Sequence, residues 1–566
     1  MHLLPKAKKL ETKHGYLLKP YIAPYTEQID ERLQKAIGKL PSGADGAKLV
    51  IHTNGTSAEN YTLSIEENKI EITSDGLNGV FYAIQTLRQI FKQEEIPCLY
   101  IEDKPDFAFR GFYQDVTRGR VAKLETLKEL VDQMAYYKLN SLQIYVEHAF
   151  EFEETKGLIA RTGYVTKEEI RELDAYCAEN FIEFIPSIAT FGHMYEILEQ
   201  EQYKHLRVLR DFEPTKNFWK MRQDHHTIDP LHPESFPLVT SLIDQTYPLY
   251  QTDTFNICGD ETFDLEQREG ENAGKLYVDF MKKIIDYVSS KGKKIMMWAD
   301  VVLNHPETID MFPDDICFLN WNYTANPPEE TVIKLKELGR KQIVCPGTNS
   351  WSRFCEDVLG DENNIVKMID YGYKHGAMGV LNTNWGDYGN LASIDLAMYG
   401  VVLGAAKSWT VDTPLCDDFY DAVNALLYGH DGAIQNYRKV TQAHFISVYV
   451  YPIVDRYFEL RYGIERDKEW DATAEQIAET QKVCMDVVKE LSTQTWEYDD
   501  ARKQIMLCAE SICALIQLGA KMYNLAYTPV VEPKAWIEKY KEAWLSTSKP
   551  SELDKFVEMI LYIDAM

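Results

Sequence analysis

The sequence predicts an α/β protein: a TIM barrel, the (β/α)8 fold, with a small N-terminal α+β domain and an all-helical C-terminal domain. From about residue 107, eight short apolar segments each precede a helical pattern. β-rich segments lie before this region, and long amphipathic helical patterns follow about residue 430. A doubly wound sheet also alternates strands and helices, so it is the alternative for the central region.

Three domains are expected in order along the 566 residues. In residues 1–105, the segments LVIHTNG, NYTLSIEEN and KIEITSD are short and β-rich, and GLNGVFYAIQTLRQIF has apolar residues at helical spacing. Residues 106–425 contain the alternating pattern of the barrel. Residues 426–566 contain long helical patterns such as DATAEQIAETQKVCMDVVKELSTQ.

The bulk composition excludes some partners and suits others. The net charge of −28 would be repelled by a phosphate backbone or an anionic membrane, so neither nucleic acid nor a membrane is an expected partner. Aromatic residues make up 12% of the chain, including 35 Tyr and 10 Trp. Flat aromatic faces suit sugar rings, although a large core also consumes aromatic side chains.

Signal peptides, membrane spans and the spacing of cysteines in a sequence indicate the compartment of a protein. The start, MHLLPKAKKLETKHG, lacks the apolar core of a signal peptide, and no run of 18 apolar residues predicts a membrane span. The ten cysteines show no CxxC spacing, and Cys258, Cys317 and Cys345 lie in apolar segments that favour buried, reduced thiols. We therefore expect a cytoplasmic protein.

Four tryptophans follow four successive predicted strands of the barrel. They are Trp298, Trp321, Trp351 and Trp385. Functional side chains of a TIM barrel stand at the C-terminal ends of its strands. One Trp at a strand end is usually a packing residue, but four in succession favour a pocket lined by indoles. Such a pocket suits a sugar and the methyl group of an N-acetyl substituent.

Ionisable and polar side chains accompany the other predicted strands. They are Arg110 in the first strand, Tyr145, Glu147 and His148 after the second, His193 after the third, Asp260 and Glu261 after the fourth, and Asp387 after the eighth. Together with the tryptophans, these residues form the candidate site.

Asp260 and Glu261 are the sharpest feature of this candidate site. They follow the apolar strand TFNIC, so two adjacent carboxylates are expected at the mouth of a buried strand. Mutual repulsion and burial should raise the pKa of at least one of them, as a general acid requires. The alternatives are an acidic strand end without catalytic function and a metal site.

Adjacent carboxylates do not match the usual glycosidase pair, which faces the scissile bond from two sides. A substrate-assisted mechanism accommodates them, because the 2-acetamido oxygen of the sugar itself attacks C1 and forms an oxazolinium ion. One carboxylate then holds the acetamide N–H, and the other protonates the leaving oxygen and later activates water.

The sequence lacks the motifs of metalloproteases, serine hydrolases and nucleotide-binding proteins. The sequence has no HExxH, no GxSxG and no Walker loop. The pairs EH at 147–148 and GH at 192–193 could donate metal ligands, but no third partner stands at a fixed spacing. We therefore expect neither a metal nor a cofactor.

The chain resembles glycoside hydrolase family 20, the β-N-acetylhexosaminidases, over nearly its whole length. NGVFYAIQTLRQI resembles the end of the small domain before that family's barrel, and FRGFYQDVTR resembles its strand-one motif. GDETFDL resembles the catalytic Asp–Glu motif, and WGDYGN resembles the strand-eight motif of a smaller bacterial branch with a helical C-terminal domain. The combination is highly specific.

The resemblance implies roles for the acidic pair and its neighbours. By it, Asp260 orients the acetamido group, Glu261 is the general acid and base, and His193 lies near them. Asp115 and Arg118 match positions that we expect to be structural.

The resemblance also implies contacts with the terminal sugar. Arg110 matches the arginine that binds the hydroxyls at C3 and C4, and Asp387 matches the acid that binds those at C4 and C6. Trp298, Trp321 and Trp385 match the indoles around the acetamido pocket.

Two departures from the family pattern alter the expected surroundings of the pair. PSIATFGH has Ala189 where the family often has an aspartate that positions the histidine, here His193. PGTNSWSRF lacks the tyrosine that usually bonds the acetamido oxygen, so Tyr323, Asn349 or a different geometry must serve. Trp351 at the outer rim, and sugar contacts by Glu147 and His148, are further hypotheses.

The expected substrate is an oligosaccharide or glycoconjugate with a terminal, non-reducing β-linked N-acetylglucosamine or N-acetylgalactosamine. The expected reaction is exo-acting hydrolysis with retention of configuration. Rival interpretations are an acetamido-assisted glycosidase that releases a disaccharide or a modified hexosamine, and a sugar-binding protein without catalysis. The helical domain could pair two subunits or support the barrel.

Overall fold

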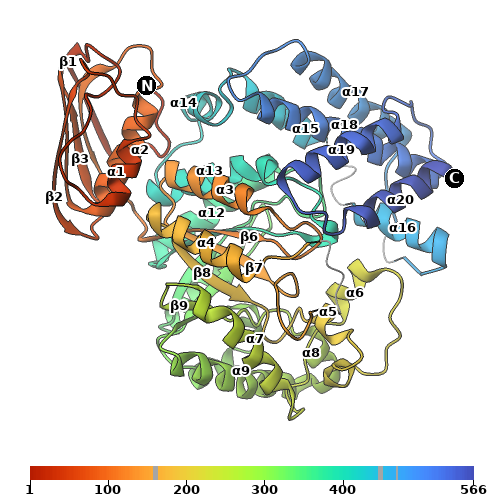
Figure 1. Ribbon diagram of the computed structural model, residues 1–566. Coiled ribbons are helices and arrows are strands. Elements are labelled where there is room, and N and C mark those ends of the chain that lie inside the picture. Colours follow the sequence, from red (N-terminus) through yellow and green to blue (C-terminus); the bar gives the residue numbers. More distant parts are fainter. Residues whose placement is uncertain (157–162, 444–449, 467–468) are drawn as a thin grey trace.

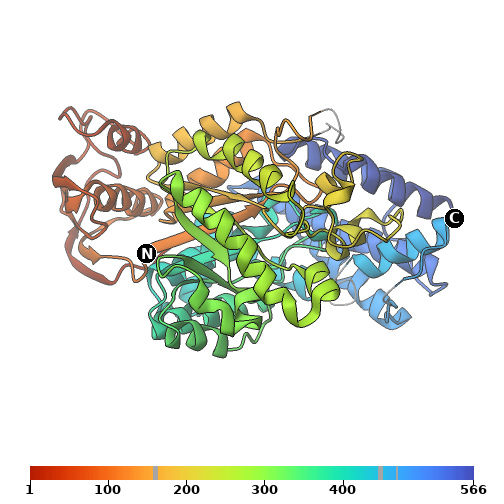
Figure 2. The same cartoon turned by 90° about the horizontal axis from the view of Figure 1, so that it is seen from below.

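A computed structural model describes residues 1–156, 163–443, 450–466 and 469–566. In Figure 1 the N-terminal domain, the barrel and the C-terminal helices follow one another from left to right. The view in Figure 2, turned by 90°, keeps this order. The two accessory domains therefore flank the barrel on opposite sides.

The N-terminal domain is a five-stranded sheet covered by helices, which confirms the expected α+β unit. The sheet order is β1-β5-β3-β4-β2. Its elements are β1 (Lys9–Tyr16), α1 (Glu31–Ile37), β2 (Lys48–Thr56), β3 (Tyr61–Ile65), β4 (Lys69–Gly76), α2 (Leu77–Ile90) and β5 (Pro97–Asp103). Helix α2 packs on the sheet through an apolar face that includes Val80, Ile84 and Leu87, all fully buried.

The central domain is a closed barrel of eight strands, paired in parallel throughout, as expected. The strands are β6 (Phe109–Asp115), β7 (Ser141–Val146), β8 (Glu183–Ile188), β9 (Thr254–Asn256), β10 (Lys294–Trp298), β11 (Cys317–Trp321), β12 (Lys341–Cys345) and β13 (Gly379–Asn384). The last strand pairs with the first, from Gly379 opposite Phe109 to Asn384 opposite Gln114. This closure rules out a doubly wound sheet, which is open.

Helices surround the barrel between the strands, and short helices lie in the loops that follow β8 and β9. The helices are α3 (Leu124–Tyr136), α4 (Lys167–Glu179), α5 (Tyr195–Leu198), α6 (Phe218–Asp224), α7 (Ser235–Thr246), α8 (Phe263–Glu269), α9 (Ala273–Ser290), α10 (Asp300–Asn304), α11 (Glu330–Glu337), α12 (Val358–His375) and α13 (Met398–Trp409). Local signals set their ends: Thr166 and Glu169 form a capping box at the start of α4.

The regular elements described after α13 are all helical, as predicted. They include α14 (Asp417–Val423), α15 (Ala433–Ala443), α16 (Tyr451–Tyr462), α17 (Ala474–Leu491), α18 (Asp499–Met522), α19 (Pro533–Thr547) and α20 (Leu553–Ala565). Helix α18 alone among the described helices is long and apolar enough to cross a membrane, but 78% of its most apolar window is buried inside the protein. That burial is typical of a core helix.

Two further expectations concern residues in these domains. The boundaries at 105/106 and 425/426 stay predictions. The first lies between β5 and β6, and the second falls within the π-helix Asn424–Tyr428, which directly follows α14. All ten cysteines are free and nine are buried, including Cys258, Cys317 and Cys345.

Arg110 lies at the N-terminal end of β6, where the barrel meets the N-terminal domain. Its guanidinium donates to both carboxylate oxygens of Glu59 at 2.9 Å and to the Tyr82 hydroxyl at 3.1 Å. The side chain is 0% exposed. The expected contact of Arg110 with a sugar is therefore wrong, because the functional groups of a parallel barrel stand at the opposite, C-terminal ends of its strands. Arg110 instead joins two domains.

Removing the partner of Arg110 tests this interdomain role. In the Glu59→Ala variant the guanidinium stays buried without its carboxylate, so we expect a loss of about 3–5 kcal/mol in the free energy of unfolding. Glu179→Ala is the matched control, because it breaks the ion pair of Lys35 with Glu179, an exposed pair between α1 and α4. Exposed pairs contribute little. Similar small losses for both variants in urea denaturation would contradict the interdomain role.

Candidate active site

The chain leaves β9 through a turn with unusual backbone angles. Cys258, Gly259 and Glu261 have φ values of +53°, +88° and +50°. Positive φ is sterically strained for the two non-glycine residues, so the surrounding contacts must hold the turn. One such contact is the Tyr277 hydroxyl, which donates to the Gly259 carbonyl oxygen at 2.8 Å. The turn places Asp260 and Glu261 at the mouth of the barrel.

His193 lies between the two carboxylates. Its Nε2 is 3.2 Å from Asp260 Oδ2 and 3.3 Å from Glu261 Oε2. The neighbouring Gly192 allows this approach, because a Cβ atom there would lie 2.4 Å from the Asp260 carbonyl oxygen. The Asp260 side chain is 9% exposed and that of Glu261 is 29% exposed, so Glu261 is the more accessible acid.

The imidazole of His193 carries a positive charge in this setting. Burial lowers its pKa and Arg118 opposes protonation, but Asp260 and Glu261 raise the pKa to about 10. The ring stacks on that of His226, with centroids 4.5 Å apart, and the backbone N–H of His193 donates to His226 Nδ1 at 2.8 Å. Burial and the charge of His193 lower the pKa of His226 to about 3, so His226 is neutral.

The expectation that one of the adjacent acids has a raised pKa is not met at Glu261. Burial raises its pKa, but the contact with His193 and the charge of His193 lower it further, to a value below the usual one. A neighbouring carboxyl whose pKa is raised is that of Asp300, at the start of α10. Burial, and then the charge of Asp260, raise its pKa to about 7. Asp300 Oδ2 accepts the backbone N–H of Glu261 at 3.0 Å.

Arg118, expected to be structural, is at the centre of the polar side of the site. Its Nε donates to Glu147 at 3.0 Å, one terminal nitrogen donates to Asp387, and the other is 3.3 Å from His193 Nδ1. The guanidinium also lies over the rings of Tyr145 and Trp385, 5.2 and 5.1 Å from their centroids. Arg110 lies near the start of β6, whereas Arg118 follows its end. This difference in position within FRGFYQDVTR could have identified Arg118 as the arginine of the site.

The predicted indoles line the other side. Trp298 is fully buried beneath Trp385, with ring centroids 5.6 Å apart. Trp321 stacks on Tyr323 at 5.0 Å, and Trp351 meets the edge of Tyr323 at 5.1 Å. The Trp385 indole N–H donates to the Tyr323 hydroxyl at 2.8 Å. The structure therefore brings Trp321, Trp351 and Trp385 together at Tyr323, and the fourth tryptophan, Trp298, joins them through Trp385.

The two candidates for the bond to an acetamido oxygen differ in their surroundings. The Asn349 backbone and side-chain N–H groups both donate to Asp361, at 2.9 and 2.7 Å. Its amide is therefore occupied away from the pocket. The Tyr323 hydroxyl joins the indole cluster through Trp385, so Tyr323 is the better-placed group.

The second-strand residue Glu147 lies close to Arg118 and to His148, and the contact of Glu147 and His148 with a sugar stays a prediction. Glu147 accepts from Arg118 and, at 3.1 Å, from the Tyr145 hydroxyl. Its Oε1 is also 4.0 Å from Nδ1 of His193, the histidine that Ala189 cannot position as an aspartate would. His148 Nδ1 is 3.8 Å from Glu147. In this arrangement Glu147 orients Arg118.

The C-terminal helices support the loops that carry these groups. The Glu552 backbone N–H donates to the Gly119 carbonyl oxygen at 3.1 Å, one residue after Arg118. The Tyr540 hydroxyl donates to the Leu391 carbonyl oxygen at 2.8 Å, in the loop after β13. The helical domain therefore packs against two loops of the site.

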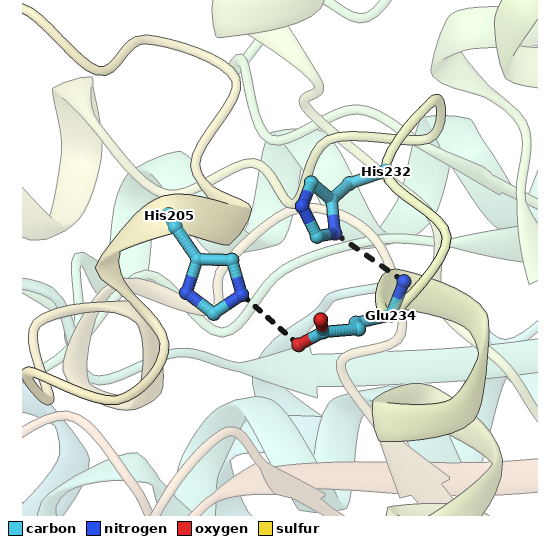
Figure 3. A group of neighbouring side chains, drawn as sticks. All are labelled: His205, His232 and Glu234. Atoms are coloured by element: carbon cyan, nitrogen blue, oxygen red, sulfur yellow. Dashed lines mark hydrogen bonds and ion pairs between the residues drawn. The ribbon is translucent and has the colours of Figure 1, made fainter.

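Two groups of side chains in the described ranges have ligand types and spacing suited to a metal ion. They are His193 with Asp260 and Glu261, and His205 with His232 and Glu234, which is drawn in Figure 3. An ion at the first group would occupy the two carboxylates of the candidate active site.

Asp300 provides a test of these electrostatics. Because its native pKa of about 7 lies above the ordinary 3.8, the native state keeps a proton that the unfolded state has lost between these pH values. The unfolding free energy therefore falls as pH rises from about 4 to about 7, by at most about 1.4 kcal/mol per pH unit.

The Asp300→Asn variant lacks this titration, and its amide oxygen can still accept the Glu261 N–H. In urea denaturation we expect the variant to gain stability relative to the unchanged chain as pH rises from about 4 to about 7. A difference between the two chains that stays constant over this range would contradict the raised pKa.

Several known proteins are similar to this chain. The beta-hexosaminidase of Porphyromonas gingivalis is 26% identical over an alignment of 313 residues that covers 48% of this chain and 40% of that protein. The beta-hexosaminidase of Akkermansia muciniphila is 35% identical over an alignment of 156 residues that covers 24% of this chain and 31% of that protein. The chain therefore matches less than half of the length of either relative.

A solved structure shares the fold over a longer span. The chitobiase of Flavobacterium johnsoniae superposes with a TM-score of 0.62 and 16% identity, covering 95% of this chain and 95% of that one. At this identity the likeness shows a common fold.

Two family models match the N-terminal domain and most of the barrel. Residues 107–375 match the model described as glycosyl hydrolase family 20, catalytic domain, and residues 7–104 match that family's domain 2. The first match contains the Asp260–Glu261 turn and its histidine. The expected resemblance is thereby confirmed, and the chain belongs to glycosyl hydrolase family 20.

Proposed function

We propose that this chain is an exo-acting β-N-acetylhexosaminidase. Its substrate would be a terminal, non-reducing β-linked N-acetylglucosamine or N-acetylgalactosamine, hydrolysed with retention of configuration. The observation that carries the proposal is the meeting of Asp260 and Glu261 on one imidazole, beside a cluster of indoles. Two carboxylates on one side of a pocket call for a nucleophile that the substrate brings.

The proposed first step joins the acetamido oxygen to C1 while the bond from C1 to the leaving oxygen breaks. Asp260 accepts the acetamide N–H and stabilises the positive charge of the oxazolinium ion. Glu261 gives its proton to the leaving oxygen. In the second step Glu261 takes a proton from water, which opens the oxazolinium ring at C1. Each proton that Glu261 loses is thus regained.

Proton donation requires a neutral Glu261, whereas the free protein holds its pKa low through His193. A bound glycoside changes both conditions. It covers the exposed part of Glu261, and its leaving oxygen competes with His193 for the carboxyl group. Both changes raise the pKa of Glu261. In this proposal His193 keeps the resting acid charged and binding prepares it for proton transfer.

The sugar would lie between Arg118 and the indoles. Arg118 and Asp387 offer a donor and an acceptor for hydroxyl groups, the roles expected of Arg110 and Asp387 from the resemblance. Trp298 and Trp385 supply an apolar surface for the acetamido methyl group. Tyr323 is the proposed partner of the acetamido oxygen.

The cytoplasmic location and the homodimer also remain proposals. The helices that contact the loops after β6 and β13 support the alternative role, in which the helical domain holds the barrel. A molecular mass in solution equal to that of one chain would rule out the homodimer.

Substitution of Glu261 tests the proposed reaction. Glu261→Gln cannot transfer the proton, so turnover of a chromogenic N-acetylglucosaminide should fall by about 10²–10⁴-fold. Asp260→Asn should also be severely impaired. Glu271→Gln is the control, because Glu271 is an exposed residue just beyond α8. Near-normal turnover in Glu261→Gln would contradict the proposal. In a panel of substrates, release of an intact disaccharide would favour the rival glycosidase.

Replacing each arginine of FRGFYQDVTR separates the two assignments. Arg118→Lys keeps the charge and loses the planar fork, so we expect kcat/KM to fall by about 10²-fold. Arg110→Lys should lower stability and leave the KM of the folded protein unchanged. Steady-state kinetics with thermal unfolding would measure both. A normal KM in Arg118→Lys together with a raised one in Arg110→Lys would restore the first assignment.

A further inference from the structure

A second group of metal-ligand side chains lies in the loops that follow β8. His205 belongs to a short 3-10 helix, Lys204–Leu206, and His232 and Glu234 precede α7. As Figure 3 shows, His205 and His232 converge on Glu234 from two segments. His205 Nε2 is 3.0 Å from Glu234 Oε2, and the two imidazole centroids are 4.9 Å apart. One ligand atom from each residue lies within 4.8 Å of the others.

Backbone hydrogen bonds hold these two segments side by side. The Val208 N–H donates to the Thr227 carbonyl oxygen at 3.0 Å, and the Asp229 N–H donates to the Leu206 carbonyl oxygen at 2.7 Å. His205 is one residue before this ladder. Its position relative to the second segment is therefore set by the fold and not by a chance meeting of long side chains.

The turn that carries the other two ligands is also fixed. Asp229 Oδ1 accepts the Leu231 N–H at 3.1 Å and an Arg268 N–H at 3.0 Å. The Ser235 hydroxyl donates to the Asp229 carbonyl oxygen at 2.6 Å. These bonds close the turn around His232, whose Nδ1 accepts the Glu234 N–H at 3.3 Å. Ligands held in this way lose little conformational freedom when they bind an ion.

We propose that His205, His232 and Glu234 bind a divalent transition-metal ion, with Zn²⁺ as the reference ion. Two imidazoles and one carboxylate are the ligands that such ions prefer, whereas Mg²⁺ and Ca²⁺ prefer oxygen alone. The His205 and Glu234 side chains are 46% and 67% exposed, so solvent completes the coordination. The net charge of −28 favours binding of a cation.

The position of this group links it to the active-site loops. Next to Thr227 is His226. Its ring Nδ1 accepts the His193 backbone N–H, and its carbonyl oxygen accepts the Met194 backbone N–H at 2.9 Å. A metal ion would join the segment that carries His205 to the segment that runs from His226 to Glu234. Because the ion binds the native state, it should raise the stability of these loops without entering the reaction.

Titration of the full chain with ZnCl₂, after removal of metal by a chelator, tests the site. We expect one saturable site by calorimetry and a higher midpoint of thermal unfolding in the presence of Zn²⁺. His205→Ala and Glu234→Ala should each weaken binding by at least about tenfold, and the double variant of His205 and His232 should abolish it. Co²⁺ should give visible absorption bands that the double variant lacks.

Two controls make the outcome decisive. His52→Ala removes an exposed histidine that lies 3.1 Å from Glu71 in the N-terminal domain. No third ligand joins this pair in the part of the chain that the structure describes, so the variant should leave Zn²⁺ binding unchanged. Glu261→Gln should also bind normally. Unchanged binding in the double variant, loss of binding in Glu261→Gln, or equal competition by Mg²⁺ would each overturn the proposal.

Discussion

The arrangement of the site depends on one cation, the His193 imidazolium, between two carboxylates at the mouth of β9. Without it, Asp260 and Glu261 would face each other across a partly buried space with only Arg118 to offset them, and one would take up a proton. With it, the pKa of Glu261 stays below its usual value, while burial and the charge of Asp260 raise the pKa of Asp300, behind the turn, to about 7.

The position of His193 depends in turn on backbone that is unfavourable by itself. His193 has a φ of +57°, and Cys258 and Glu261 also have positive φ. Strain of this kind persists where many surrounding contacts hold the conformation. Here the contacts come from separate parts of the chain: the Tyr277 hydroxyl of α9, the Asp300 carboxylate of α10 and the His226 ring. A rigid scaffold on all sides is therefore a condition for the acid pair.

The sequence alone predicted the barrel, its flanking domains and the convergence of the tryptophans, because these follow from periodicity and from the rule that strand ends meet. It misassigned Arg110 because a motif match does not distinguish the two ends of a strand. The barrel rule would have selected Arg118, which follows β6. The pKa of Glu261 was also out of reach. The direction of its shift depends on His193, which lies far away in sequence. The repulsion from Asp260, in contrast, can be read from the dipeptide itself.

The two ends of the barrel separate stability from chemistry. At the N-terminal end, Arg110 is fully paired with Glu59, so a charge is buried at little net cost and the domains are held together. At the C-terminal end, Arg118 is shared between Glu147 and Asp387, beside the His193 ring. A cation shared in this way can exchange one partner for a sugar hydroxyl without being left unpaired. The same residue type, eight positions apart in one motif, thus serves as a clamp where its partners are complete and as a ligand-binding group where they can be exchanged.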